Sequence, residues 1–220
     1  MSDTKYTALI LGATGLVGSN VLDLLLKDNK YGRIYTVSRR KIAIEHDKLI
    51  QIISEIDDIE KHIKNINITH IFSCVGSTAA KTPNQTDYYK IDLEYPLKVA
   101  TTLKDTCKVF SLVSSIGANP SSKNFYLKLK GEVEEAIQSV GIETVHIFRP
   151  SLLLGDRKEF RLAEKIAQIL SPIINLLLFG KYKDYRSIRA RDVASAMVNM
   201  AAGDKKGIHI YQTSHIKEVA

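Results

Sequence analysis

The 220-residue sequence predicts an α/β protein in which helices cover both faces of a doubly wound, mostly parallel sheet. Short strands rich in Val, Ile and Leu alternate with helical segments, and only buried parallel strands tolerate such continuous apolar runs. Glycines spaced by three separate the first strand from the first helix. The composition, with 45% hydrophobic and 25% charged residues, is typical of a globular protein that buries a sizeable core without disulfides.

Six strands are expected before Pro150, each an apolar, β-favouring run bounded by turn residues. They are residues 5–11, 33–38, 49–54, 70–75, 109–114 and 143–148. Between them, apolar residues recur at the helical period, and Gly141 closes the last of these helices. The expected helices are residues 16–26, 56–64, 87–104 and 125–140.

The chain beyond Pro150 continues the alternation without a repeat, a low-complexity segment or a linker. The segments expected there are a helix at 160–178, a helix at 190–202 and a strand at 208–213. We therefore expect a single domain over residues 1–220, with a small substrate-side region from about residue 151. Ligands of such sheets bind at the carboxyl ends of the strands, so the residues that follow each strand are the candidate site residues.

The loop at residues 12–18, Gly-Ala-Thr-Gly-Leu-Val-Gly, follows a strand and opens a helix, and in this context the glycine pattern predicts a dinucleotide-binding Rossmann fold. The first glycine permits a tight turn, Gly15 removes a side chain where a pyrophosphate approaches backbone N–H groups, and Gly18 lets the helix pack closely against the sheet. The helix N-terminus presents unpaired donors to the phosphates. The alternative is a loop that needs glycines only for packing. The loop residues expected to bind the cofactor are Gly12, Thr14, Gly15, Leu16, Val17 and Gly18.

Ser38, Arg39 and Arg40 end the second strand, twenty positions past the last glycine, where an NAD site carries Asp or Glu. Arginine pairs with phosphate through charge-assisted, often bidentate hydrogen bonds, and serine can donate another. The sequence therefore predicts NADP(H) as the preferred cofactor. NAD(H) is the alternative if the two arginines are only solvated surface residues.

Tyr126 and Lys130 are four residues apart, so both project from one face of the helix expected at 125–140. This spacing is common on helix surfaces, but here it opens the helix that follows the fifth strand, which ends in Ser114 and Ser115. Reduction of a carbonyl by hydride transfer needs a proton donor, and a phenol assisted by a neighbouring ammonium can supply it. We expect Ser115, Tyr126 and Lys130 to form a catalytic set. Lys130 also binds the cofactor ribose, and Ser114 is the alternative to Ser115.

At these motifs the sequence resembles the atypical short-chain dehydrogenase/reductases of the NAD(P)-binding Rossmann superfamily. Two longer segments, residues 121–134 and 148–157, resemble the Tat-interacting protein 30 (oxidoreductase) family. The resemblance spans nearly the whole chain. It implies NADPH binding and places Ser115, Tyr126 and Lys130 in the catalytic positions.

The same resemblance implies further cofactor contacts. Glu55 is expected near the adenine, and Val75 and Gly76 beside the middle of the cofactor. The loop from Pro150 to Leu152 is expected beside the nicotinamide, with serine where relatives often have glycine.

The leading interpretation is an NADPH-dependent oxidoreductase that reduces a small carbonyl substrate. The alternatives are an NADP(H)-sensing regulatory protein without turnover and, less favoured because little chain follows the sixth strand, a sugar-nucleotide epimerase or dehydratase. A pure sensor has no chemical need for Tyr126 and Lys130 together, which favours the enzyme. Asp92 falls where sugar-nucleotide relatives carry Asn, and is either catalytic or a helix-surface or structural carboxylate.

The formal net charge is +7, but the charges are scattered without a long basic run, so we expect no nucleic-acid partner. The longest apolar stretch, 169–180, is too short to span a bilayer, and it either closes the core or forms the interface of a homo-oligomer. Two cysteines without CxxC spacing or a histidine cluster are expected to be core thiols, and no metal site is expected. The N-terminus lacks a signal-peptide pattern, so the expected location is cytoplasmic.

Overall fold

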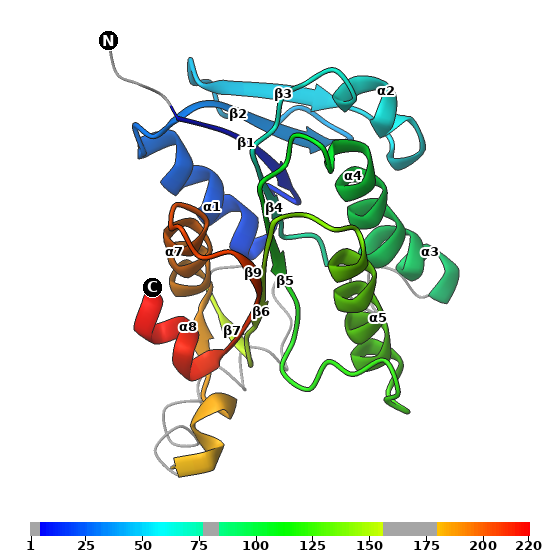
Figure 1. Cartoon of the computed structure of the whole chain (residues 1–220), viewed down its shortest axis with the longest axis vertical. Coiled ribbons are helices and arrows are strands. Elements are labelled where there is room, and N and C mark those ends of the chain that lie inside the picture. Colours follow the sequence, from blue (N-terminus) through cyan, green and yellow to red (C-terminus); the bar gives the residue numbers. More distant parts are fainter. Residues whose placement is uncertain (1–4, 77–83, 156–179) are drawn as a thin grey trace.

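The computed structural model describes residues 5–76, 84–155 and 180–220. Within these residues, seven strands form one sheet in which every neighbouring pair is parallel (Figure 1). In chain order they are β1 (Tyr6–Leu11), β2 (Tyr31–Ser38), β3 (Leu49–Ile53), β4 (His70–Ser73), β5 (Val109–Val113), β6 (Thr144–Arg149) and β9 (Gly207–Gln212). The predicted doubly wound α/β fold is confirmed, and the sheet is parallel throughout.

The strand order across the sheet is β3-β2-β1-β4-β5-β6-β9, so the order reverses between β1 and β4. In doubly wound sheets the crevice at such a reversal is where ligands bind. The residues that follow β1, β2, β4, β5 and β6 therefore meet at one edge of the molecule.

Two helical layers cover the sheet, as Figure 1 shows. One face carries α1 (Leu16–Lys27), α7 (Ala190–Ala201) and α8 (Thr213–Val219). The other face carries α2 (Ile59–Ile63), α3 (Gln85–Tyr89), α4 (Tyr95–Leu103) and α5 (Phe125–Ser139). The helix expected at 160–178 lies outside the described residues.

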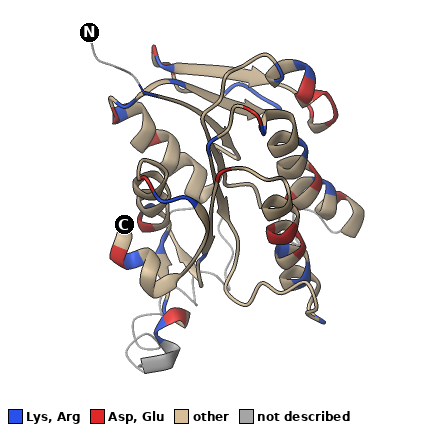
Figure 2. Ribbon diagram, viewed as in Figure 1, with Lys and Arg blue, Asp and Glu red and all other residues tan. Residues whose placement is uncertain are grey.

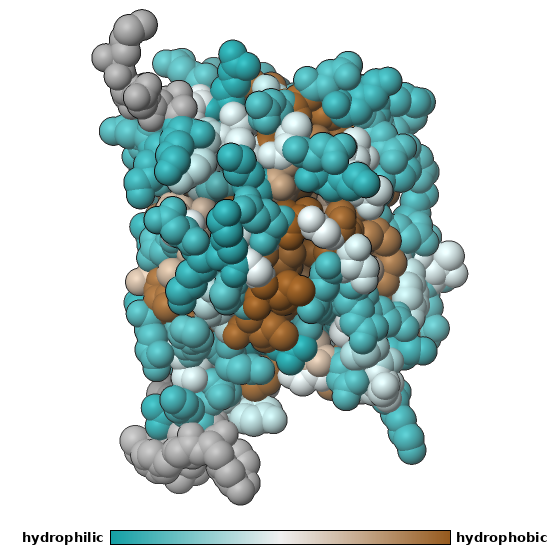
Figure 3. Space-filling view, viewed as in Figure 1, coloured by the Kyte–Doolittle hydropathy of each residue, from teal (hydrophilic) through white to brown (hydrophobic). Residues whose placement is uncertain are grey.

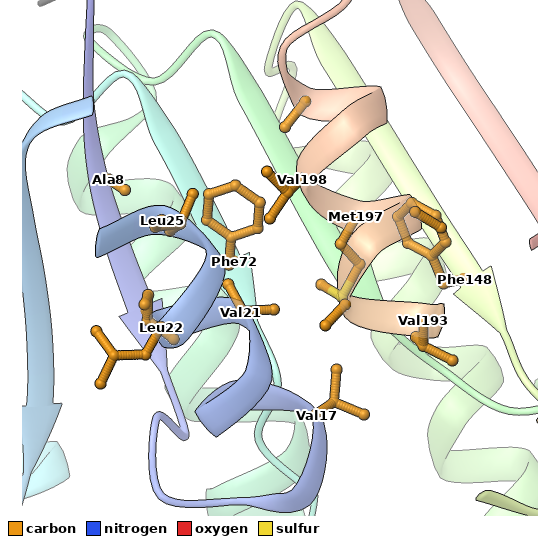
Figure 4. Packing of buried hydrophobic residues seen from close by; sticks show 14 of the residues in the cluster. Ala8, Val17, Val21, Leu22, Leu25, Phe72, Phe148, Val193, Met197 and Val198 are labelled. Carbon is orange, nitrogen blue, oxygen red and sulfur yellow. The ribbon is translucent and has the colours of Figure 1, made fainter. Parts of the chain in front are cut away.

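The first helical layer packs through the apolar faces of α1 and α7, which lie side by side over the sheet (Figure 4). Val21 and Leu25 of α1 point toward Phe72 of β4, and Met197 of α7 lies between Phe72 and Phe148 of β6. All five side chains are fully buried. Burial of each such side chain contributes roughly 1.5–3 kcal/mol, so this layer holds the glycine loop between β1 and α1 in place.

The helix expected over 87–104 is instead α3 and α4 joined by a π-helical segment, Lys90–Glu94. The N–H of Tyr95 bonds the carbonyl of Lys90, five residues back. Pro96 has no N–H to donate to the carbonyl of Asp92, which removes one α-helical bond at this point. The widened turn places Asp92 in the interior, where its side chain is buried.

Three further differences concern the ends of two strands and the presence of short elements that were not expected. β4 and β5 end at Ser73 and Val113, before the residues expected, so Ser114 and Ser115 lie just beyond the strand. A short pair of parallel strands, β7 (Leu153–Leu154) and β8 (Ile188–Arg189), was not expected because each is only two residues long. Helix α8, also not expected, follows the last strand directly.

The two edges of the sheet differ in their covering. At β3, the side-chain amide of Gln51 bonds the N–H of Ile42 at 2.7 Å and the carbonyl of Ile44 at 3.1 Å, which lays the preceding loop along the strand. At β9, Ile208 and Ile210 are 52% and 44% exposed. Figure 3 shows hydrophobic surface in the middle of the face where Figure 1 places β9.

Candidate functional site

The glycine loop lies at the carboxyl end of β1, beside the end of β4. Gly12 has a φ of +79°, and a Cβ there would lie 2.8 Å from the carbonyl oxygen of Cys74. A Cβ at Gly18 would lie 2.1 Å from the Gly12 carbonyl oxygen, so Gly18 packs against the loop itself rather than against the sheet as expected. No larger residue fits either position without moving the backbone.

Gly15 is the N-cap of α1 and makes no side-chain cap bond. The first-turn N–H groups of a helix have no intrahelical partner, and no side chain of the described residues bonds those of α1. Thr14, next to this end, is exposed. The donors and the positive end of the helix dipole fit a phosphate group, which they would bind without displacing any protein group.

At the end of β2, the Ser38 hydroxyl donates a hydrogen bond to the carbonyl of Arg40 at 2.6 Å. The proton that could serve a phosphate is therefore used to fold the turn, which sequence spacing alone does not reveal. Arg39 and Arg40 are exposed, and neither forms an ion pair with any residue of the described ranges. Glu55, after β3, is also exposed.

Tyr126 and Lys130 project from the first turns of α5, with the Lys130 Nζ 5.9 Å from the centre of the Tyr126 ring. The helix begins at an N-cap, Asn124, whose side-chain oxygen accepts the N–H of Leu127 at 3.1 Å. Tyr126 is 37% exposed, whereas Lys130 is buried. The pair thus combines an accessible phenol with a buried ammonium.

Lys130 forms an ion pair with Asp92, with 2.8 Å between Nζ and Oδ2. Asp92 is therefore not a helix-surface carboxylate, one of the roles considered for it. Burial lowers the pKa of Lys130, but its interactions with Asp92, Tyr126 and Glu134 outweigh this effect, and the net pKa is raised. Lys130 accordingly stays an ammonium ion at neutral pH.

The two serines after β5 have different surroundings. The buried Ser114 hydroxyl donates to the carboxylate of Glu134, which also accepts the Nε–H of Arg149 at 2.9 Å. The Ser115 hydroxyl donates only to the carbonyl of Ile116, at 3.3 Å, within the described residues. Ser114 is committed to a buried ionic network, while Ser115 is held by one long bond.

The loops after β4 and β6 complete this edge of the sheet. Val75 is partly buried and Gly76 exposed after β4, while Pro150 is buried and Leu152 is 44% exposed after β6. A Cβ at Gly155 would lie 2.7 Å from a methyl of Leu16, so the loop after β6 packs onto the glycine loop.

Hydrogen bonds connect the loop after β6 to the C-terminal region. The N–H of Ser151 donates to the Thr213 hydroxyl at 3.0 Å, and the Ser151 hydroxyl donates to the carbonyl of Arg186. Asp184 accepts the N–H of Ser214 at 2.9 Å. Ser151 therefore connects the loop after β6 to residues of the C-terminal region.

Of the charged residues in this region, Glu134 was not identified from the sequence, and the role of Asp92 was left open. Glu134 lies four residues past Lys130, so Tyr126, Lys130 and Glu134 share one helix face, and that spacing could have identified it. The role of Asp92 could not be decided because the sequence predicts a regular helix here, and such a helix does not show which side chain a π-helical turn directs into the interior.

Other kinds of site find little support in the described ranges. These ranges contain no group of three His, Cys, Asp or Glu residues that could hold a metal ion. None of their helices has the length and apolar character needed to cross a membrane. Burial raises the pKa of Cys74 and of Cys107 to about 12, so neither thiol is a ready nucleophile. Figure 2 shows basic and acidic residues spread over the helices and strand ends.

A doubly wound parallel sheet with a glycine loop between β1 and α1 defines the Rossmann class of NAD(P)-binding proteins. The sequence model of the NAD dependent epimerase/dehydratase family matches residues 8–212, and the chain belongs to this family. It is 33% identical to Protein HTATIP2 of Rattus norvegicus over 169 residues, covering 74% of this chain and 69% of that protein. It is 30% identical to Protein fmp52, mitochondrial, of Emericella nidulans over 227 residues, covering 94% of this chain and 96% of that protein. The resemblance expected from the motifs is confirmed.

Solved structures share the fold at low sequence identity. A UDP-N-acetylglucosamine 4-epimerase from Methanobrevibacter ruminantium matches with a TM-score of 0.69 and 19% identity, over 95% of this chain and 77% of that chain. A short chain dehydrogenase family protein from Francisella tularensis matches with a TM-score of 0.68 and 13% identity, over 96% of this chain and 98% of that chain. These similarities establish the fold alone.

The expected cytoplasmic location is wrong in the light of these relatives. The similar proteins from Emericella nidulans, Candida glabrata and Aspergillus niger are all named mitochondrial. The expectation rested on the lack of a secretory signal-peptide pattern, and this feature does not separate the cytoplasm from other compartments inside the cell.

Proposed function

We propose that this protein is an NADPH-dependent oxidoreductase that reduces a small carbonyl substrate, with Ser115, Tyr126 and Lys130 as its catalytic residues. The observation that carries the proposal is the pairing on α5 of an accessible phenol with a buried, charged lysine, at the edge of the sheet that also holds the glycine loop. Because Lys130 is buried, it is not simply a solvated surface charge.

The cofactor, when bound, supplies the hydride. In the proposed complex, the N–H groups at the start of α1 hold the pyrophosphate, and Arg39 and Arg40 bind the 2′-phosphate of NADP(H). Two exposed arginines that form no ion pair with an acidic residue of the described ranges support this preference over NAD(H). The further proposed contacts are Thr14, Leu16, Val17, Ser38, Glu55, Val75, Gly76, Tyr126, Lys130, Pro150 and Leu152.

The chemistry proposed for the protein is proton transfer. Tyr126 donates its proton to the carbonyl oxygen of the substrate, and the Lys130 ammonium stabilises the phenolate that remains. The Ser115 hydroxyl donates a hydrogen bond to the same oxygen and orients it. The region from about residue 151, tied to α8 through Ser151 and Thr213, supports the substrate side.

The test is a screen of aldehydes, ketones and quinones that follows NADPH absorbance, with Tyr126→Phe as the variant. General acid catalysis is worth roughly 10²–10⁴-fold, so the variant should lose most of kcat while still binding NADPH. Tyr185→Phe, which removes the hydroxyl of an exposed tyrosine outside the proposed catalytic set, is the matched control and should keep kcat. NADPH binding without turnover of any compound would instead identify a cofactor-sensing protein.

A further inference from the structure

Asp92 and Lys130 form the most deeply buried ion pair of the described residues, with side chains 0% and 5% exposed. Asp92 lies in the π-helical segment between α3 and α4, and Lys130 lies on α5. Two helical elements are thus joined by one charge pair, and π-helical turns occur often at functional sites.

The pair lies directly beneath the backbone at the carboxyl end of β4. A Cβ built at Gly76 would lie 3.7 Å from the Lys130 Nζ and 3.9 Å from the Asp92 Oδ2. The centre of the Tyr126 ring is 5.9 Å from the same ammonium. The Lys130 ammonium is therefore close both to the backbone after β4 and to the proposed proton donor.

Among the described residues, the remaining titratable groups around Lys130 come from helices α3 and α5. Tyr88 of α3 is buried, and burial together with the charge of Asp92 raises its pKa, which keeps it neutral. Glu134 of α5 is neutralised by Arg149 of β6. Asp92 is then the group that supplies Lys130 with a counter-charge at hydrogen-bonding distance.

We propose that Asp92 is the positioning residue of this site: it keeps Lys130 charged and holds the ammonium where Tyr126 and the cofactor ribose meet. The Asp92 Oδ2 lies 2.8 Å from the ammonium nitrogen, which limits the directions open to the three N–H groups. This inference rests on the function proposed above.

The variant Asp92→Asn keeps the shape and a hydrogen-bond acceptor but removes the charge. A buried lysine without a counter-charge loses its proton more easily, so NADPH affinity between pH 7 and 9.5 should fall more than about tenfold in the variant. The wild-type affinity should change little over this range. The alkaline limb of the kcat/KM profile should move down by about one pH unit or more.

The matched control is Asp57→Asn, which removes a neighbouring ion pair with Lys90 of the same 2.8 Å length on the surface. It should leave both pH profiles unchanged. If Asp92 has only a structural part, Asp92→Asn will lower the free energy of unfolding but leave the pH profile of NADPH binding in place, and the proposal is overturned.

A second variant, Asp92→Glu, covers the case in which the asparagine variant does not fold. It keeps the charge and moves it by one methylene, so NADPH affinity should fall at all pH values while the profile keeps its position. A profile displaced to lower pH in this variant overturns the proposal. Absence of turnover in the wild type would refute the proposed function only, because the binding profiles test Asp92 without catalysis.

Discussion

At the scale of single residues, the loop at 12–18 shows where the backbone decides which amino acid fits. Gly12 has a positive φ and faces the Cys74 carbonyl, and Gly18 faces the Gly12 carbonyl. Both positions exclude a side chain for steric reasons within the protein. The glycine pattern is thus needed to bring α1 close to β1, and the exposed helix N-terminus follows from that closeness.

Arg39 and Arg40 are expected to select the cofactor. Replacing both with glutamine should weaken NADPH binding about 10- to 100-fold and leave NADH binding unchanged, because only NADPH has the 2′-phosphate that charge-assisted bonds would hold. Thermal stabilisation by each cofactor measures this, since a ligand of the native state raises stability by RT ln(1 + [L]/Kd).

The control for this experiment removes the same charge at the other end of β2. Lys30 and Arg33 are exposed there, and their double replacement with glutamine should leave NADPH binding unchanged. Equal stabilisation of the wild type by NADH and NADPH would contradict a role for the two arginines.

At the scale of elements, α5 connects the proposed catalytic residues to the sheet. Its buried Glu134 accepts bonds from Ser114 after β5 and from Arg149 of β6, so one carboxylate joins three elements. Gly131 lets the same helix approach the loop before it, because a Cβ there would lie 2.2 Å from the nitrogen of Pro120. Tyr126 and Lys130 are oriented by these contacts.

Arg149→Met should lower the free energy of unfolding by about 3 kcal/mol, because it leaves the Glu134 carboxylate buried without its counter-charge. Adding Glu134→Leu should recover part of this loss, since an apolar pair has no charge to desolvate. Urea denaturation at pH 7 measures both variants. A double variant less stable than the single one would contradict this account of the network.

At the scale of the whole molecule, two histidines are buried within the sheet. His70 of β4 bonds the Tyr31 hydroxyl at 2.8 Å, and His146 of β6 bonds the Tyr211 hydroxyl at 3.0 Å. Burial, with nearby charged groups adding to it, lowers the pKa of each histidine to about 4. Both are therefore neutral in the folded protein at neutral pH.

The two histidines should make the protein acid-sensitive. Between pH 6.5 and 4 the unfolded chain binds protons at these residues that the folded chain does not, so the free energy of unfolding falls as the pH falls. Above pH 6.5 the effect is absent. With both histidines contributing, the slope is up to about 2.7 kcal/mol per pH unit.

Chemical denaturation at pH 4.5, 5.5 and 6.5 measures this slope. The double variant His70→Gln, His146→Gln should have a shallower slope than the wild type, and His62→Gln, which replaces an exposed histidine, should have the wild-type slope. An unchanged slope in the double variant would show that other groups cause the acid sensitivity.

Much of the fold could be predicted because its signals are local. Apolar runs, the glycine spacing and the helical period identify the strands and helices, and strand ends missed by a residue or two do not change the topology. The π-helical segment was not predictable in the same way, since Pro96 shows that a helical bond is lost but not which side chain turns inward.

The sequence by itself determined the class of fold, the family and the residue types at the edge of the sheet, because each depends on neighbours along the chain. Only the tertiary structure decided that Lys130 pairs with Asp92 and that Ser114, but not Ser115, is committed to Glu134. The physical reason is that burial and counter-charges come from elements far apart in the chain, and no local spacing encodes which of them meet.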